Sequence, residues 1–393
     1  MNNVTMLVNK MTIKIRSDGR YEGRLTVNDR RKSFYGKTKA EVKANAKEYL
    51  MKVENGYKES EKILLNDYIE YWLKKYKYSR IEPSSYTRLY RVYECQIKPT
   101  VGKRYIGDIK TKDVQNLIDE HANPSNKNVK PLAKSGLKKI IQLLRPCLEK
   151  AVTEGIIQEN PCTDVILPTE SYIKTQTKQQ ITLSDDEIAE FKKCALQKYK
   201  TSNEYRSRDA FILLIILNLG LRVGEALALE WDDINFQEKL VYIKKTVQSN
   251  IVDFNGDDRK IYDRVKDSTK TKSGERVLKI NDTTMYYITE LMEYDKRKGI
   301  SSPYVACTNV GTRNNARNLQ RSLNRIINKS TLPHDMTLHT LRHTFGSTLI
   351  RRGIGIEVVS KLMGHANITI TYLKYIHVLQ EQQAKAMDMI SIS

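Results

Sequence analysis

Long apolar runs are absent from this sequence of 393 residues. The longest, Ala210 to Leu217, is far shorter than the roughly 20 residues that a membrane-spanning helix needs, and it lies too far inside the chain to be a signal peptide. Cysteine is also scarce, with five residues, an odd number, and no Cys-x-x-Cys pair. This pattern argues against a disulfide framework and against a cysteine zinc site. We therefore expect a protein of a reducing compartment, the cytoplasm, with no membrane partner.

Acidic residues are few relative to basic ones. Lys and Arg number 67 against 46 Asp and Glu, which gives a formal net charge of +21. Such an excess suits a polyanion, because each Lys or Arg that meets a phosphate releases condensed counterions. Charge alone therefore favours nucleic acid as the partner, with a membrane surface or no special partner as the alternatives. A hydrophobic content of 40% excludes a disordered chain, and the length suggests two to four domains at roughly 100–200 residues each.

The first segment, residues 1–58, predicts a three-stranded sheet covered by one helix. Alternating residues on both sides of Asp18-Gly19 indicate a hairpin, a third strand is expected at 32–35, and Thr38 with Glu41 forms a capping box where the helix begins. The outer face of this sheet carries three basic residues, Lys14, Arg16 and Arg24. Such a face can enter a DNA major groove, although a merely solvated face fits the local pattern equally well.

The second segment, residues 63–166, predicts an all-helical domain. Its apolar residues follow the spacing of amphipathic helices, and helices are expected at 64–73, 84–96, 111–121 and 135–152. Polar stretches at 55–62 and at about 168–182 read as the linkers on either side.

The third segment, residues 182–393, predicts a mainly helical domain with a small antiparallel sheet. A buried helix at 208–217 is expected to end at Gly220 in the left-handed conformation. A strand is expected at 239–247 and a hairpin at 267–281. Residues 248–266 form a longer polar insertion than a minimal sheet needs, which either contacts DNA or a partner or is inert. The expected fold class is thus a multi-domain α+β chain.

Five of the six histidines follow residue 333, and the arginines between them hint at a single site. Three local strings stand out. They are Gly-x-Arg-x-Gly-Glu at 220–225, His-x-x-Arg at 339–342, and Gly-His at 364–365 followed by Tyr-x-His at 375–377. His-x-x-Arg alone is common, but the combination in this order and spacing is specific.

This combination resembles the tyrosine recombinases, the phage-type integrase family, and is most similar to integrases of conjugative transposons with an N-terminal arm-binding domain. The resemblance implies an arm-type DNA-binding domain at 1–58, a helical core-binding domain at 63–166 and a catalytic domain with a C-terminal helix at 182–393. It implies that the last two close around double-stranded DNA at core attachment sites while the first binds arm sites. It also implies a bacterial protein that works on the nucleoid.

The expected chemistry is transesterification at a phosphodiester, which passes through a phosphorane-like species with extra negative charge. Arg222 and Arg342 are the natural pair to bind it, because a guanidinium is a permanently charged fork of donors. Tyr375 is the expected nucleophile. A phenol titrates near about 10, so a base must help it lose its proton, and the resemblance gives that role to His339. The 3′-phosphotyrosyl link preserves the bond energy, so rejoining needs neither ATP nor a cofactor.

The resemblance implies the remaining roles. His365 is expected to hydrogen-bond the phosphate, and a hairpin lysine is expected to protonate the departing 5′-oxygen. Spacing favours Lys272 for that step over Lys270. Glu225 is expected to orient the site through hydrogen bonds. Arg276, like Lys279, is expected to be an ordinary hairpin charge.

Two local alternatives remain. His339 and His343 have the i, i+4 spacing of a metal site, but Glu357 is the only carboxylate between residues 336 and 380, and a two-metal nuclease needs several. We expect no metal, and we expect His343 to be a packing or supporting residue. Tyr372 competes with Tyr375 as the nucleophile, but no histidine follows it at the same spacing.

The resemblance also implies an assembly. A short amphipathic helix expected at 378–392 would dock on a neighbouring protomer in a ring of four, although docking in cis is equally open. The implied activity is integration and excision of a mobile element by a homotetramer through a Holliday junction, helped by an excisionase and a host DNA-bending protein. The alternatives are a catalytically silent DNA-binding regulator and a type IB topoisomerase-like enzyme. Competent residues at all the core positions argue against the first, and the arm-like segment argues against the second.

Overall fold

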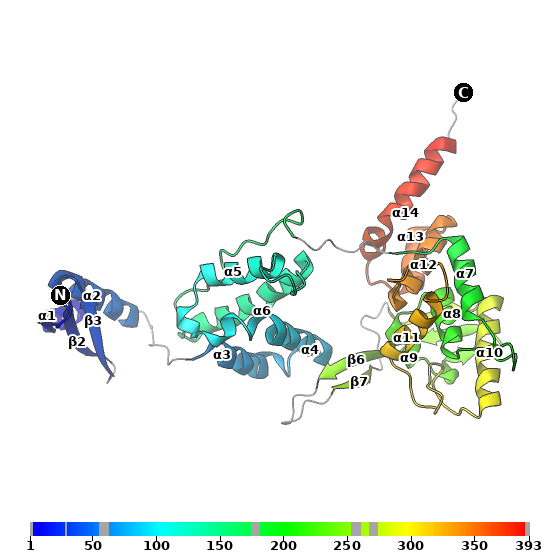
Figure 1. Ribbon diagram of the computed structural model, residues 1–393, viewed down its shortest axis with the longest axis horizontal. Helices are drawn as coiled ribbons and strands as arrows, with labels where there is room; N and C mark the ends of the chain where they lie inside the picture. Colours follow the sequence, from blue (N-terminus) through cyan, green and yellow to red (C-terminus); the bar gives the residue numbers. More distant parts are fainter. Residues whose placement is uncertain are drawn as a thin grey trace. The chain divides into compact units, whose positions relative to one another are not determined.

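The computed structural model describes residues 3–27, 30–54, 63–173, 181–252, 261–266 and 274–389 (Figure 1). Backbone contacts divide the chain into two compact units, Met1–Thr177 and Lys178–Ser393. None of the helices in these described ranges combines the length and the apolar character that crossing a bilayer requires.

The first unit opens with a small sheet and two helices. Strands β1 (Thr12–Ile15), β2 (Tyr21–Val27) and β3 (Arg30–Gly36) form an antiparallel sheet in that order; α2 (Lys39–Glu54) packs on it, and α1 (Asn3–Asn9) packs on α2. The predicted sheet and helix are confirmed, whereas α1 was not predicted. The capping box is present, since the Glu41 N–H donates to Thr38 Oγ1 at 3.1 Å. An apolar core joins these layers: Val8, Met11, Phe34, Val42, Ala46 and Leu50.

A helical part follows in the same unit, and the four predicted helices are confirmed. Leu65, Ile69 and Trp72 are almost fully buried, as their amphipathic spacing indicates. The turns η1 and η2 continue α3 and α4 as π-helix. The elements are α3 (Leu65–Trp72), η1 (Leu73–Lys77), α4 (Pro83–Val92), η2 (Tyr93–Ile97), η3 (Val101–Lys103), η4 (Ile106–Asp108), α5 (Thr111–Ala122) and α6 (Lys134–Thr153).

The second unit is built around one buried helix. The apolar helix α8 contacts α7, α10, α11 and α12, and its side chains from Ala210 to Leu217 are all buried, as predicted. The helical elements of the unit are α7 (Asp185–Ala195), α8 (Asp209–Leu219), α9 (Val223–Ala228), η5 (Trp231–Asp233), α10 (Asp282–Lys298), α11 (Ala316–Ile327), α12 (Leu338–Arg351), α13 (Ile356–Met363) and α14 (Ile368–Met389).

The strands of this unit form two separate antiparallel sheets. One has the order β4 (Ile234–Asn235), β5 (Leu240–Ile243), β8 (Arg276–Lys279), and the other pairs β6 (Thr246–Val252) with β7 (Ile261–Lys266). The single strand predicted at 239–247 is therefore wrong, because β5 and β6 pair with different partners. The described ends of the 248–266 insertion belong to the β6–β7 ribbon. The second half of the hairpin predicted at 267–281 is β8, which pairs with β5; its first half, with Lys270 and Lys272, lies outside the described residues.

Helix α14 runs unbroken from Ile368 to Met389 and carries Tyr375 (Figure 1). The helix predicted at 378–392 is confirmed as far as Met389, where the described residues end, but it continues α14 and is not a short helix of its own. The stretch contains no glycine or proline, so nothing in the sequence interrupts the helix after Tyr375. With its mostly helical units and small antiparallel sheets, the chain has the predicted α+β class.

Candidate active site

The first arginine of the site lies where α8 ends and α9 begins. Gly220 closes α8 with a φ of +61°, and a Cβ there would lie 2.3 Å from Phe345 Cδ1, so the position requires the glycine that the sequence predicted. Arg222 follows as the N-cap of α9. Its backbone N–H donates to Glu225 Oε2 at 2.8 Å and its Nη1 donates to Oε1 at 2.6 Å. The turn from α8 into α9 thus pairs an arginine with a carboxylate.

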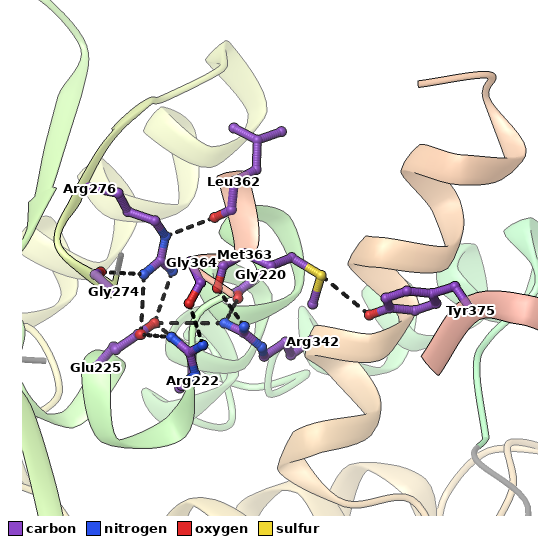
Figure 2. A network of polar contacts seen from close by, with 10 residues as sticks. All are labelled: Gly220, Arg222, Glu225, Gly274, Arg276, Arg342, Leu362, Met363, Gly364 and Tyr375. Atoms are coloured by element: carbon purple, nitrogen blue, oxygen red, sulfur yellow. Dashed lines mark hydrogen bonds and ion pairs between the residues drawn. The ribbon is translucent and has the colours of Figure 1, made fainter. Parts of the chain in front are cut away.

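Glu225 holds two further arginines (Figure 2). It is only 2% exposed. Arg276 donates to both of its oxygens, at 2.9 and 3.2 Å, and Arg342 Nη1 lies 3.8 Å from Oε2. Burial alone would raise the pKa of Glu225, but the hydrogen bond and charge of Arg276, with the charges of Arg222 and Arg342, outweigh it and lower that pKa. Glu225 is therefore ionised at neutral pH and forms ion pairs with all three arginines.

The same three arginines bind the C-terminal end of α13 (Figure 2). The last carbonyls of a helix lack partners within it and carry partial negative charge, so they favour cationic donors. Three successive carbonyls are used: Leu362 O accepts from Arg276 Nε at 2.8 Å, Met363 O from Arg342 Nη2 at 2.5 Å, and Gly364 O from Arg222 Nη2 at 2.6 Å. One carboxylate and one helix end cannot neutralise three guanidiniums, so the cluster retains positive charge that suits a phosphate.

Arg222 is the most open member of this cluster. Its side chain is 36% exposed, against 4% for Arg342 and 7% for Arg276. Burial and the charge of Arg222 lower the pKa of Arg342, which still stays a cation at neutral pH because guanidinium is so strongly basic. Arg222 therefore offers most of the donor surface that a phosphate from solvent can reach.

His365 follows directly after the α13 carbonyls. Burial and the charges of Arg342 and Arg222 lower the pKa of His365 to about 3, so the ring is neutral at pH 7. Its Nδ1 lies 2.7 Å from Thr371 Oγ1 on α14. A neutral ring that accepts the Thr371 proton at Nδ1 carries its own proton on Nε2. This tautomer presents an N–H donor of the kind that a phosphate contact requires.

For the DNA cleavage that the resemblance implies, we predict that Thr371→Val lowers the rate roughly tenfold, because valine keeps the shape but cannot fix the tautomer of His365. Thr371 is fully buried, so the near-isosteric change is the informative one. The measurement is single-turnover cleavage of a nicked duplex. Thr369→Val, at an exposed position of the same helix, is the matched control. A Thr371→Val rate equal to that of the control would contradict the assigned role.

The Tyr375 hydroxyl contacts Met363 and His343. The tyrosine is fully buried. Its hydroxyl lies 3.3 Å from Met363 Sδ (Figure 2) and 3.4 Å from His343 Nδ1. Gly346 makes room for it, because a Cβ there would lie 2.3 Å from the Tyr375 hydroxyl oxygen. Burial raises the pKa of the Tyr375 phenol. The phenol is therefore protonated and held in an apolar notch, next to the arginine cluster through the shared residue Met363.

The two histidines of α12 lie at different depths. His339 is exposed on the first turn, and His343 is buried one turn further on. Their ring centroids are 6.1 Å apart, and that of His343 is 6.2 Å from Tyr375. Although part of His339 reaches solvent, the atoms packed around each ring and the charge of Lys374 lower the pKa of both histidines, that of His343 to about 3. His343 is thus the imidazole next to Tyr375. The ring of the expected base, His339, lies beside that of His343.

The prediction that Arg276 is an ordinary hairpin charge is wrong. Its side chain is buried, and it binds both Glu225 and the end of α13. No local pattern in the sequence signals this role, because Glu225 and Arg276 are 51 residues apart. Lys279 is exposed, as expected, and Tyr372 is 48% exposed. Thr371 and Lys374, which the sequence motifs do not include, also lie at the site.

The basic face predicted for the N-terminal sheet is present. Lys14, Arg16 and Arg24 are all exposed. In the strand register Lys14 lies opposite Glu22, and Glu22 pairs with Arg24 at 2.9 Å and with Arg16 at 3.9 Å. The face is therefore basic, with one carboxylate at its centre. Across the described ranges no group of three or more His, Cys, Asp or Glu side chains could hold a metal ion.

Comparisons with known proteins agree with the motifs and the fold. The family model described as "Phage integrase family" matches residues 182–382, more than half of the chain, and "Phage integrase, N-terminal SAM-like domain" matches residues 64–121. The chain therefore belongs to the phage integrase family and is a tyrosine site-specific recombinase. The tyrosine recombinase XerC-like protein of Caldanaerobacter subterraneus subsp. tengcongensis is 28% identical over 379 residues, 92% of this chain and 91% of that protein. XerC of Chlamydia trachomatis serovar L2 is 24% identical over 183 residues, 46% of this chain and 50% of that protein.

Solved integrase structures share the fold. The Tn1549 transposon integrase in complex with a circular intermediate DNA superposes with a TM-score of 0.62 at 18% identity, over 82% of this chain and 99% of that one. A lambda integrase tetramer bound to a Holliday junction gives a TM-score of 0.58 at 15% identity, over 92% of this chain and 94% of that one. At these identities the likeness establishes the fold alone.

Proposed function

We propose that this recombinase integrates and excises a mobile genetic element, cutting and rejoining double-stranded DNA through a 3′-phosphotyrosyl intermediate and a Holliday junction. The arginine cluster at Glu225 carries the proposal, because its uncompensated charge lies next to the Tyr375 hydroxyl through the shared residue Met363. A transposon integrase with the same fold is known in complex with a circular intermediate DNA, which supports the mobile-element role.

In the proposed reaction the scissile phosphate binds Arg222, Arg342 and Nε2–H of His365. The Tyr375 oxygen attacks phosphorus, and the bond from phosphorus to the 5′-oxygen breaks. His339, neutral at pH 7 because its pKa is lowered, accepts the phenolic proton. The 5′-oxygen receives a proton from Lys272, or from Lys270. Attack by a 5′-hydroxyl from the partner strand reverses these steps, so the cycle needs no ATP.

We also expect DNA binding to move the nucleophile. The Tyr375 hydroxyl contacts Met363 Sδ and lies beside His343 Nδ1, whereas the phosphate is expected at the guanidiniums. Met363 contacts both Arg342 and Tyr375. Its carbonyl oxygen accepts a hydrogen bond from Arg342, and its sulfur accepts one from the Tyr375 hydroxyl. We therefore expect a phosphate that binds Arg342 to loosen the notch that holds Tyr375.

The proposed assembly follows the three segments of the chain. Residues 1–58 bind arm sites through Lys14, Arg16 and Arg24, residues 63–166 bind core sites, and residues 182–393 catalyse. A homotetramer on paired sites, with α14 docked between protomers, would hold the junction. An excisionase and a host DNA-bending protein would set the direction, and the setting is a bacterial cytoplasm at the nucleoid.

An excision assay tests this function. The two ends of the element that carries this gene are placed as direct repeats on a plasmid, and the protein is expressed in a host without the element. The proposal predicts a circular product whose junction is amplified by PCR, and no product with Tyr375→Phe. A topoisomerase-like enzyme would relax the plasmid without forming a junction, and a silent regulator would do neither; either result would overturn the proposal.

A further inference from the structure

We infer that Lys374, the residue before Tyr375 on α14, is a further phosphate-binding residue that contacts the scissile phosphate. The inference rests on the proposed function and adds a cation that the motifs of the sequence do not include. Because Lys374 and Tyr375 are successive residues of one helix, the motion that brings the nucleophile to the phosphate also moves this cation.

The inner face of α14 places Lys374 toward the site. Thr371, Tyr375 and Val378 are buried, at 0%, 0% and 3% exposure, and they define that face. Lys374 lies three residues after Thr371 and four before Val378, a spacing that puts it on the same side of the helix. Its side chain is accordingly half-buried. The neighbour Leu373 is 67% exposed and turns away.

The groups around Lys374 are cations and neutral imidazoles. Burial and the charges of Arg342 and Arg222 lower the pKa of Lys374, and the charge of Lys374 in turn lowers the pKa of His339, His343 and His365. Lys374 therefore lies within electrostatic reach of the groups that surround the expected phosphate position. Within the described part of the chain its ammonium group forms no ion pair or hydrogen bond, and the site carboxylate Glu225 is engaged by Arg222 and Arg276.

An ammonium group within electrostatic reach of two guanidiniums is unfavourable without an anion. The repulsion and the partial loss of hydration both act against the charged form. A DNA phosphate removes the penalty, since each cation that meets it replaces a condensed counterion. The extra negative charge of the phosphorane-like transition state strengthens the contact as Tyr375 attacks. The charged form of Lys374 is thus more favourable with a phosphate bound than in the protein without DNA.

The competing explanation is a lysine whose stem merely covers apolar surface while its head stays in water. The two explanations differ in one respect. A phosphate contact depends on the negative charge of the scissile phosphate, whereas a packing role does not.

The test uses Lys374→Met, which keeps the length of the side chain and removes its charge, and Lys374→Arg, which keeps the charge. Lys361→Met, at an exposed position of α13, is the matched control. Full-length proteins are compared on nicked duplexes whose scissile group is an ordinary phosphodiester or an uncharged methylphosphonate. Dissociation constants and single-turnover adduct rates are both measured, so the comparison does not depend on cleavage of the methylphosphonate.

On the phosphodiester we expect Lys374→Met to slow adduct formation about tenfold to a hundredfold and to weaken binding, with Lys374→Arg close to wild type. On the methylphosphonate, wild type and Lys374→Met should bind equally. An equal loss of affinity on both duplexes, or no loss on either, would overturn the role of Lys374 and leave the proposed function standing. Failure of the wild type to form any adduct on its own element ends would instead overturn the proposed function.

Discussion

Replacing Tyr375 by phenylalanine is expected to abolish the covalent protein–DNA adduct while leaving DNA binding intact. The ring lies in a notch bounded by Gly346 and Met363, and phenylalanine fills the same space without the hydroxyl. The oxygen that we propose attacks phosphorus is lost. The expected loss is therefore complete rather than partial, because the reaction has no covalent route without its nucleophile.

The measurement is a denaturing gel of wild type and Tyr375→Phe on a nicked suicide duplex, without added metal. Tyr372→Phe is the matched control, since Tyr372 lies one turn earlier on α14 with 48% of its surface exposed. We expect the control to form the adduct as wild type does. An adduct formed by Tyr375→Phe and lost in Tyr372→Phe would exchange the assignments of the two tyrosines.

Arg222→Lys is expected to lower the rate of adduct formation about 10²- to 10³-fold, even though the charge is kept. The Arg222 guanidinium donates to Glu225 Oε1 and to Gly364 O at the same time, and part of its side chain remains exposed to solvent. A single ammonium group cannot match this planar fork. The transition state, whose oxygens carry the extra charge, therefore loses more stabilisation than the bound substrate does.

Single-turnover rates and dissociation constants of Arg222→Lys separate these two effects. Arg206→Lys, at an exposed arginine that contacts Gln197 and the Lys198 carbonyl, is the matched control for loss of a guanidinium. A thermal melt checks the fold. If Arg222→Lys weakened DNA binding as much as it slowed cleavage, Arg222 would be a binding residue with no special role in the transition state.

The arginines of the local motifs could be predicted from sequence, but the third arginine could not. Arg222 and Glu225 lie within one helical turn, so a short string defines their relation. Arg276 joins the same carboxylate from a strand 51 residues later, and a lone arginine in a short strand looks like a surface charge. Only its contacts with Glu225 of α9 and with the end of α13 account for the burial of its side chain.

The position of Tyr375 was also beyond the sequence. Its notch depends on a glycine of α12 and a methionine of α13, and no periodicity along α14 reveals either. The helices of 63–166 could be predicted because their apolar spacing is local. The strand at 239–247 was misjudged because local alternation does not tell which partner each half pairs with.

The measurement that tests the central claim most directly is mass spectrometry of the DNA-linked peptide from the trapped adduct. We expect a DNA 3′-phosphate on the Tyr375 hydroxyl, with the released strand ending in a 5′-hydroxyl. A phosphoryl group on another residue, or a link to the 5′ end, would contradict it. So would tight, specific binding of the element ends by wild-type protein with no covalent product at all.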